Sequence, residues 1–97
     1  MTIFNLFSSE KTAMVLMALA ESSGSSYSQV LAREIGSVYC HAVNIVNRLE
    51  EMGIVTSEKQ GRVKYITLTK DGWEIANYIK AIQDKIDRLS GVKKNGK

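Results

Sequence analysis

The sequence predicts an α+β domain that is mainly α-helical: three helices, then a two-stranded β-hairpin, then a long C-terminal helix. Apolar residues recur at helical spacing over residues 37–52 and again over 69–90, which predicts two amphipathic helices. The segment SEKQGRVKYITLT at 57–69 places a lone glycine among charged residues and then turns β-branched and aromatic, which predicts a hairpin. At 97 residues the chain has the length of one domain, so we expect 1–97 to fold as a single unit.

Composition is that of an ordinary globular protein with a small excess of positive charge. Hydrophobic residues make up 44% of the chain and charged residues 24%, so disorder is not expected through its middle. The formal net charge is +3. An excess of this size suits an anionic partner such as nucleic acid, and it equally suits a surface that only keeps the protein in solution.

Cysteine usage and hydropathy exclude several classes of protein. With Cys40 as the single cysteine no intramolecular disulfide can form, and with His41 as the single histidine a Cys/His metal site is not expected. We therefore predict no metal and no cofactor, and leave open whether Cys40 is redox-active or pairs between subunits. The N-terminus lacks a signal-peptide pattern, and the longest apolar run, AMVLMALA, is shorter than the roughly 20 residues of a membrane span. A cytoplasmic protein is expected.

The first helix is expected within FSSEKTAMVLMALAESSGSS, residues 7–26. Ser8 or Ser9 can cap its N-terminus, and Glu10 is favourably placed at the positive end of the helix dipole. The helix is broadly apolar, so it should be central in the fold. The run SSGSS ends it.

The second helix is expected within SYSQVLAREIG, residues 26–36. Ser26 and Gln29 have the spacing of a capping box, and Gly36 suits the turn after the helix. Tyr27 is a candidate for a short β bridge just before the helix.

The third helix is predicted from Ser37 to Met52, and Gly53 ends it. One stripe at helical spacing is apolar and should face the core; it comprises Val38, Ala42, Ile45, Val46, Leu49 and Met52. The opposite side is mostly polar and comprises Ser37, Cys40, Asn44, Asn47 and Glu51, with His41 and Arg48 on its flanks.

The hairpin is predicted from two short strands, IVTSE at 54–58 and VKYITLT at 63–69, joined by KQGR. Gly61 suits a turn residue with positive φ. Lysine on such a hairpin can also serve only to keep the sheet edge soluble.

The last helix is predicted over 69–90, capped by Thr69, and a basic tail at 91–97 should be flexible. Its apolar residues follow a 4-3-4-3 spacing, the pattern of a coiled-coil seam; they are Ile75, Ile79, Ile82, Ile86 and Leu89. A small domain can bury only the first turns of such a stripe, so we expect a homodimer through this helix. The apolar N-terminal segment with Ile3, Phe4, Leu6 and Phe7 is expected to complete the interface. The alternative is a monomer in which this helix packs back on the first.

The segment from 30 to 72, VLAREIGSVYCHAVNIVNRLEEMGIVTSEKQGRVKYITLTKDG, resembles the winged helix-turn-helix domain of MarR-like and related small bacterial and archaeal transcription regulators. RLEEMGIV followed by LTKDG is the specific pair of motifs. The chain departs from that family in the turn IGSVYCHA, and we expect it to lack the extra N-terminal dimerisation helix of full MarR proteins. The resemblance implies that helix 37–52 enters the major groove of DNA, and that the hairpin tip at 58–64, the wing, touches the adjacent backbone or minor groove.

Several side chains of the third helix are candidates for DNA contact: Ser37, Tyr39, His41, Asn44, Asn47 and Arg48. Asn44 and Asn47 can read adenine, and Arg48 can reach a phosphate or a guanine. In the wing the candidates are Lys59, Gln60, Arg62 and Lys64, whose cations suit phosphates or a narrow minor groove. The alternative is a solvated helix face beside a charged hairpin.

The sequence therefore predicts a sequence-specific, homodimeric regulator that binds double-stranded DNA. No catalytic motif, membrane segment or small-molecule effector site is legible, so an enzyme is not expected. Two alternatives stay open: a non-specific architectural DNA-binding protein, and a winged-helix module that binds protein.

Overall fold

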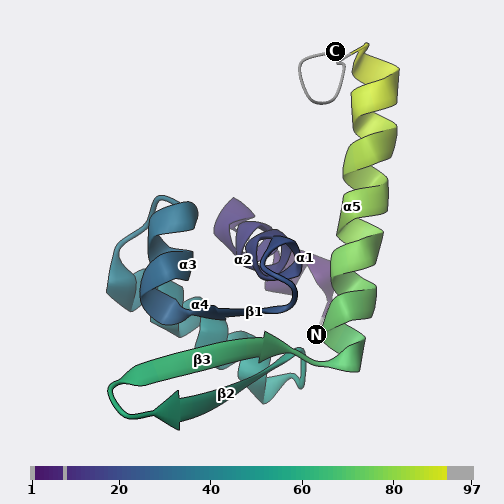
Figure 1. Ribbon diagram of the computed structural model, residues 1–97. Helices are drawn as coiled ribbons and strands as arrows, with labels where there is room; N and C mark the ends of the chain where they lie inside the picture. The colour runs from purple at the N-terminus through teal and green to yellow at the C-terminus, as the bar shows by residue number, and fades with distance from the viewer. Residues whose placement is uncertain (1, 8, 92–97) are drawn as a thin grey trace.

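The computed structural model describes residues 2–7 and 9–91 and confirms the mainly helical α+β fold (Figure 1). Its elements, in chain order, are α1 (Ile3–Leu6), α2 (Glu10–Glu21), β1 (Ser25–Tyr27), α3 (Ser28–Glu34), α4 (Tyr39–Glu51), β2 (Val55–Gln60), β3 (Val63–Leu68) and α5 (Lys70–Ser90). The predicted helices correspond to α2, α3, α4 and α5, and the hairpin to β2 and β3. The short helix α1 was not predicted.

The strands form an antiparallel sheet in the order β1-β3-β2. The bridge expected at Tyr27 is a full three-residue strand, β1, in which Ser26 pairs with Ile66 and Tyr27 with Tyr65. The predicted capping box of Ser26 and Gln29 is wrong, because Ser26 pairs with Ile66 in the sheet and α3 begins only at Ser28. The N-cap residue of α3 is Tyr27, which makes no side-chain capping bond.

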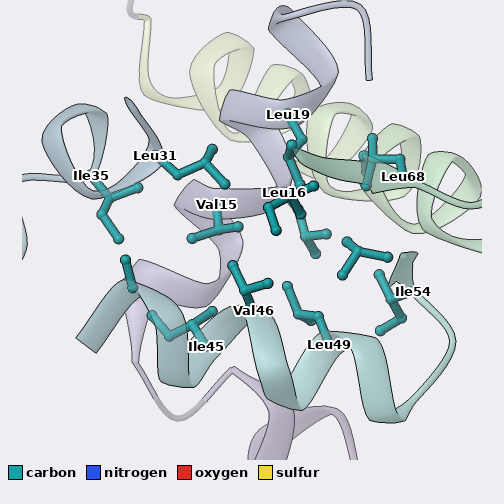
Figure 2. Close-up of a cluster of buried hydrophobic side chains, with 14 of the residues drawn as sticks. Val15, Leu16, Leu19, Leu31, Ile35, Ile45, Val46, Leu49, Ile54 and Leu68 are labelled. Carbon is teal, nitrogen blue, oxygen red and sulfur yellow. The ribbon is translucent and has the colours of Figure 1, made fainter. Parts of the chain in front are cut away.

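The core is built around α2, whose Val15, Leu16 and Leu19 are fully buried. Figure 2 shows these side chains meeting residues of α3, α4 and the sheet; the labelled partners are Leu31, Ile35, Ile45, Val46, Leu49, Ile54 and Leu68. The expectation of a central first helix is confirmed.

Helix α4 is shorter than predicted at both ends. Ala42, Ile45, Val46 and Leu49 are buried as the apolar stripe requires. Val38, however, is an N-cap residue with an extended backbone and is 69% exposed. Met52 at the other end is 40% exposed. The core is narrower than the helix, so the stripe is buried only in its middle turns.

Two predicted caps are confirmed. The Ser9 hydroxyl accepts a hydrogen bond from the Lys11 backbone N–H at 3.2 Å and begins α2. The Thr69 hydroxyl accepts one from the Gly72 N–H at 3.0 Å and begins α5. The other candidate, Ser8, lies outside the described residues.

Helix α5 extends well beyond the rest of the molecule (Figure 1). Ala76 is buried, and Ile75 and Ile79 pack at the edge of the core. Further along, Ile82 is 56% exposed and Leu89 is 77% exposed. The predicted tail falls mostly on 92–97, which lie outside the described residues. No helix in the described part of the chain is long and apolar enough to cross a membrane.

Gly72, in the first turn of α5, lies against the backbone of Ile54 in the segment that follows α4. A Cβ atom at position 72 would lie 2.1 Å from the backbone oxygen of Ile54 and 3.0 Å from Leu68. Because backbone cannot move aside as a flexible side chain can, only glycine fits here.

We predict that Gly72→Ala lowers the free energy of unfolding by about 2 kcal/mol or more, because the added methyl group overpacks this junction. Urea denaturation followed by circular dichroism measures the change. Gly61→Ala is the matched control, since nothing lies within 4 Å of the added methyl there. Only the cost of its left-handed backbone, about 1 kcal/mol, should appear. A cost at Gly72 no larger than that at Gly61 would contradict the assignment.

Candidate nucleic-acid interface

A tight turn joins α3 to α4 and sets the angle between the two helices. Gly36 occupies the left-handed region there, with φ of 65°. The Lys11 ammonium of α2 donates a hydrogen bond to the carbonyl of Ile35 at 2.5 Å, which satisfies the C-terminal end of α3. The helix pair is thus fastened to the central helix, which makes it a rigid support for surface side chains.

The face of α4 opposite its buried residues points to solvent. Cys40, Asn44, Asn47 and Glu51 are all exposed on it, as the sequence predicted. Neither asparagine side chain has a hydrogen-bond partner within the described residues. Two amide groups one turn apart are therefore free to bind an external molecule.

The two flanks of α4 are tied to other elements. On one flank, the Arg48 guanidinium donates a hydrogen bond to the Asn5 carbonyl of α1 at 3.2 Å. Helical geometry puts His41 on the same flank. On the other flank, the Glu50 carboxylate accepts a hydrogen bond from the Ser57 hydroxyl of β2 at 2.8 Å. The wing therefore lies beside the Glu50 flank of α4, away from Arg48.

The wing turn consists of two residues, Gly61 and Arg62, between the paired residues Gln60 and Val63. Gly61 has φ of 64°, as predicted, and Arg62 is not among the residues with positive φ, which is the pattern of a type II′ turn. Strand β2 ends at Gln60 and not at the predicted residue 58, so Lys59 and Gln60 belong to β2, whereas β3 begins at Val63 as predicted.

Lys59 and Lys64 pair directly across the two strands of the wing. Side chains alternate between the two faces of a strand, so both lysines share the face of Ser57 and Ile66, which the helices cover. Like charges placed opposite each other destabilise a hairpin. No acidic side chain forms an ion pair with either lysine in the described part of the protein. Gln60 points to the other face of the sheet, and Arg62 lies at the tip.

The predicted dimer residues gather at a second place, an apolar groove between α1 and α5. Its main cavity has a volume of about 280 Å³. The lining residues are Thr2, Ile3, Leu6, Phe7, Met52, Ile75, Tyr78, Ile79 and Ile82. Phe7, Ile75, Ile79 and Ile82 were predicted, as was the apolar N-terminal segment with Ile3 and Leu6, whereas Met52 and Tyr78 were not predicted for this surface. The side chain of Phe4 lies outside what the structure describes, and Ile86 and Leu89 continue the α5 stripe past the groove.

The described residues contain no group of three or more His, Cys, Asp or Glu side chains that could hold a metal ion. Ser37 precedes α4, and its hydroxyl donates weakly to the Val38 carbonyl at 3.4 Å. Ser37 is thus next to the helix start, where the sequence placed a phosphate contact, but outside the helix itself.

A tyrosine pair joins β1 to β3 just before α3 begins. The hydroxyl oxygens of Tyr27 and Tyr65 are 2.7 Å apart, and the ring centroids are 4.5 Å apart. The hydrogen bond with Tyr27 raises the pKa of Tyr65, with smaller contributions from desolvation and from the Tyr27 charge. The pair holds the start of α3 against the sheet and therefore helps to fix the helix pair relative to the wing.

These features define a winged helix-turn-helix domain. No family model matches the chain. An uncharacterized protein of Archaeoglobus fulgidus is 37% identical over 78 residues, which are 77% of this chain and 82% of that protein. The crystal structure of AF1382 from Archaeoglobus fulgidus superposes with a TM-score of 0.76 and 30% identity, over 89% of this chain and 98% of that one.

The MarR family transcriptional regulator SPO1453 from Silicibacter pomeroyi superposes with a TM-score of 0.70 and 25% identity, over 81% of this chain. The match spans 57% of SPO1453, so this chain covers little more than half of that regulator. The chain therefore shares the winged helix-turn-helix fold of MarR family transcription regulators.

We predict that Tyr65 titrates above its ordinary pKa of about 10 in the folded protein. The folded state then holds this proton more tightly than the unfolded state. The stability that the pair adds is complete below about pH 10 and is lost as pH rises through the higher folded value. Tyr27→Phe removes the main cause, so the Tyr65 ring resonances should then titrate at lower pH in an NMR titration. Tyr78→Phe, at an exposed tyrosine of α5, is the control and should leave Tyr65 unchanged; a Tyr27→Phe protein with an unaltered Tyr65 titration would refute the assignment.

Proposed function

We propose that this protein is a cytoplasmic, sequence-specific transcriptional regulator that binds double-stranded DNA as a homodimer. Helix α4 would enter the major groove, and the wing would contact the adjacent backbone or minor groove. The observation that carries the proposal is the pair Lys59 and Lys64, which lie opposite each other and have no ion-pair partner among the described residues, on a hairpin that is bonded to the Glu50 flank of α4.

The wing lysines favour an anionic partner because their arrangement costs stability in the free protein. Two like charges in direct cross-strand contact repel each other, and phosphates would neutralise both. Arg62 at the tip adds a third cation with a guanidinium suited to phosphate. Solubility of the hairpin alone does not require two lysines opposite each other, because lysines paired with acidic residues would keep it equally soluble.

Sequence choice is assigned to α4. Asn44 and Asn47 are exposed, unpartnered and one turn apart, and an asparagine amide matches the donor and acceptor of adenine in the major groove. Arg48 uses one N–H for the Asn5 carbonyl. A guanidinium has five such donors, so Arg48 can keep this bond and still reach a phosphate. Ser37, Tyr39 and His41 would contact the duplex near the start of the helix.

The likeness to SPO1453, a MarR family transcriptional regulator, favours regulation over catalysis. Two rival functions use the same fold: non-specific packaging of DNA through the lysines alone, and binding of a protein. Binding of random and pool-selected duplexes at two salt concentrations separates the three. Preference for the selected duplex of about a thousandfold supports specific regulation, equal salt-sensitive binding supports packaging, and no binding at low salt supports a protein partner.

We predict that Lys64→Ala weakens binding to every duplex and reduces the slope of log affinity against log salt by about one unit, because one phosphate contact is lost. Fluorescence anisotropy at several salt concentrations measures both quantities. Lys80→Ala removes the same charge from an exposed site on α5 and should change neither by a comparable amount. Equal effects of the two substitutions would mean that the wing responds only to net charge.

The proposed dimer rests on the apolar groove and on the α5 stripe that continues from it. Ile82, Ile86 and Leu89 are 56%, 49% and 77% exposed on one line of the helix, and Ile3 across the groove is 60% exposed. Exposure of this many large apolar side chains in one patch is typical of an interaction surface. The heptad spacing of the stripe makes a second copy of α5 the partner that fits it. Two copies would present two α4 helices to a twofold operator.

We predict that Ile82→Asp converts a dimer into a folded monomer, because position 82 is exposed in the single chain and a buried carboxylate at the interface is strongly unfavourable. Sedimentation equilibrium measures the mass, and circular dichroism checks that the helices remain. Ala81→Asp adds the same charge beside the stripe and should leave the dimer intact. A dimer that survives Ile82→Asp places the interface elsewhere.

A further inference from the structure

We propose that the start of α4 reads the 5-methyl group of thymine in the major groove, through an apolar strip formed by Val38, Tyr39 and Val43. The inference rests on the proposed DNA-binding function and names the chemistry that this surface selects.

The strip is exposed at the point where α4 begins. Val38 is 69% exposed and Tyr39 is 48% exposed, and Val43, one turn further, is half-buried. The core ends before this turn, so it covers neither Val38 nor Tyr39. Two large apolar side chains therefore face solvent at the end of the helix that should approach DNA.

The local backbone gives no reason for valine at this position. Val38 is the N-cap residue of α4 and makes no side-chain capping bond, although serine, threonine, aspartate and asparagine cap helices far better. The neighbouring Ser37 hydroxyl donates to the Val38 carbonyl and leaves the first N–H groups of α4 uncapped. The Val38 side chain thus neither caps α4 nor packs in the core. A contact with a partner molecule would explain why an apolar residue stands at this position.

The strip lies between the two surfaces already assigned to DNA. At 100° per residue, Val43 falls between the outward line of Asn44 and Asn47 and the line of Glu50, and Tyr39 lies on the Glu50 flank itself. That flank is where the Ser57 hydroxyl of the wing is bonded. A duplex that touches the outward face of α4 and the wing at once must therefore pass over the strip.

Major-groove chemistry then selects the ligand. The edges of the bases present hydrogen-bond donors and acceptors there, and the 5-methyl group of thymine is the apolar one. The adjacent amides of Asn44 and Asn47 match adenine, which is the partner of thymine in the same base pair. In an A·T pair, the two amides can thus bind the adenine, and the apolar strip can contact the methyl group of the thymine.

The test compares two duplexes of alternating sequence, one of dA and dT and the other of dA and dU, each long enough to cover two successive major grooves. Deoxyuridine keeps every hydrogen bond of thymidine and lacks only the methyl group. The wild-type protein should bind the thymine duplex more tightly, by roughly fourfold for each methyl group that it buries. The double variant Val38→Ser/Tyr39→Gln should bind the two duplexes equally.

This double variant is suited to the test because serine is a better N-cap than valine and glutamine is a good helix former, so α4 should stay folded. Lys64→Ala is the control: it should weaken binding to both duplexes and leave their ratio unchanged. Equal binding of the two duplexes by the wild-type protein would overturn the inference. So would a preference for the thymine duplex that persists in the double variant. Either result would leave the proposed function standing. Failure of the wild-type protein to bind either duplex at low salt would overturn both.

Discussion

The backbone carbonyl of Ile54 is the point on which the arrangement of the molecule depends. It accepts from the Thr69 N–H at 3.1 Å, it lies 3.0 Å from the Thr69 hydroxyl, and α5 approaches it so closely that position 72 admits only glycine. The end of α4, the base of the hairpin and the start of α5 therefore meet at one peptide group. Because α5 carries the apolar stripe and α4 the amide face, this junction fixes the direction of the proposed dimer helix relative to the proposed DNA surface.

The surface around that junction divides into regions of different chemistry. The wing carries cations placed where they repel each other, and the outward face of α4 carries amides that have no hydrogen-bond partner among residues 2–7 and 9–91. At the other side of the molecule, α1 and α5 enclose a groove that is almost wholly apolar. The Arg48 guanidinium donates a hydrogen bond to the Asn5 carbonyl and so links α4, which carries the amides, to α1, which lines the groove. We propose a polyanion as the partner of the first surface and a second copy of the chain as the partner of the other.

Most of the fold follows from local sequence signals, namely helix caps, turn residues and apolar periodicity. Ser9 and Thr69 cap the helices predicted for them, Gly61 makes the turn predicted for it, and the apolar stripe of α4 is buried at Ala42, Ile45, Val46 and Leu49. The errors have a different origin. Ser26 has the spacing of a capping box, yet it pairs with Ile66, forty residues away along the chain. Helix α1 is only four residues long, too short for a periodic pattern to show.

By itself, the sequence determined the element types, the helix caps, the wing turn and the polar and apolar faces of α4 and α5, because these depend on residues within a few positions of one another. Tertiary structure alone decided which neighbours those faces acquire. It exposed Val38, which periodicity assigns to the core, because the core ends before the first turn of α4. It also turned Arg48 toward α1, set Lys59 against Lys64, and made Gly72 indispensable. These contacts join segments that are distant in sequence, and a pattern within a few residues does not indicate which distant segments will lie next to each other.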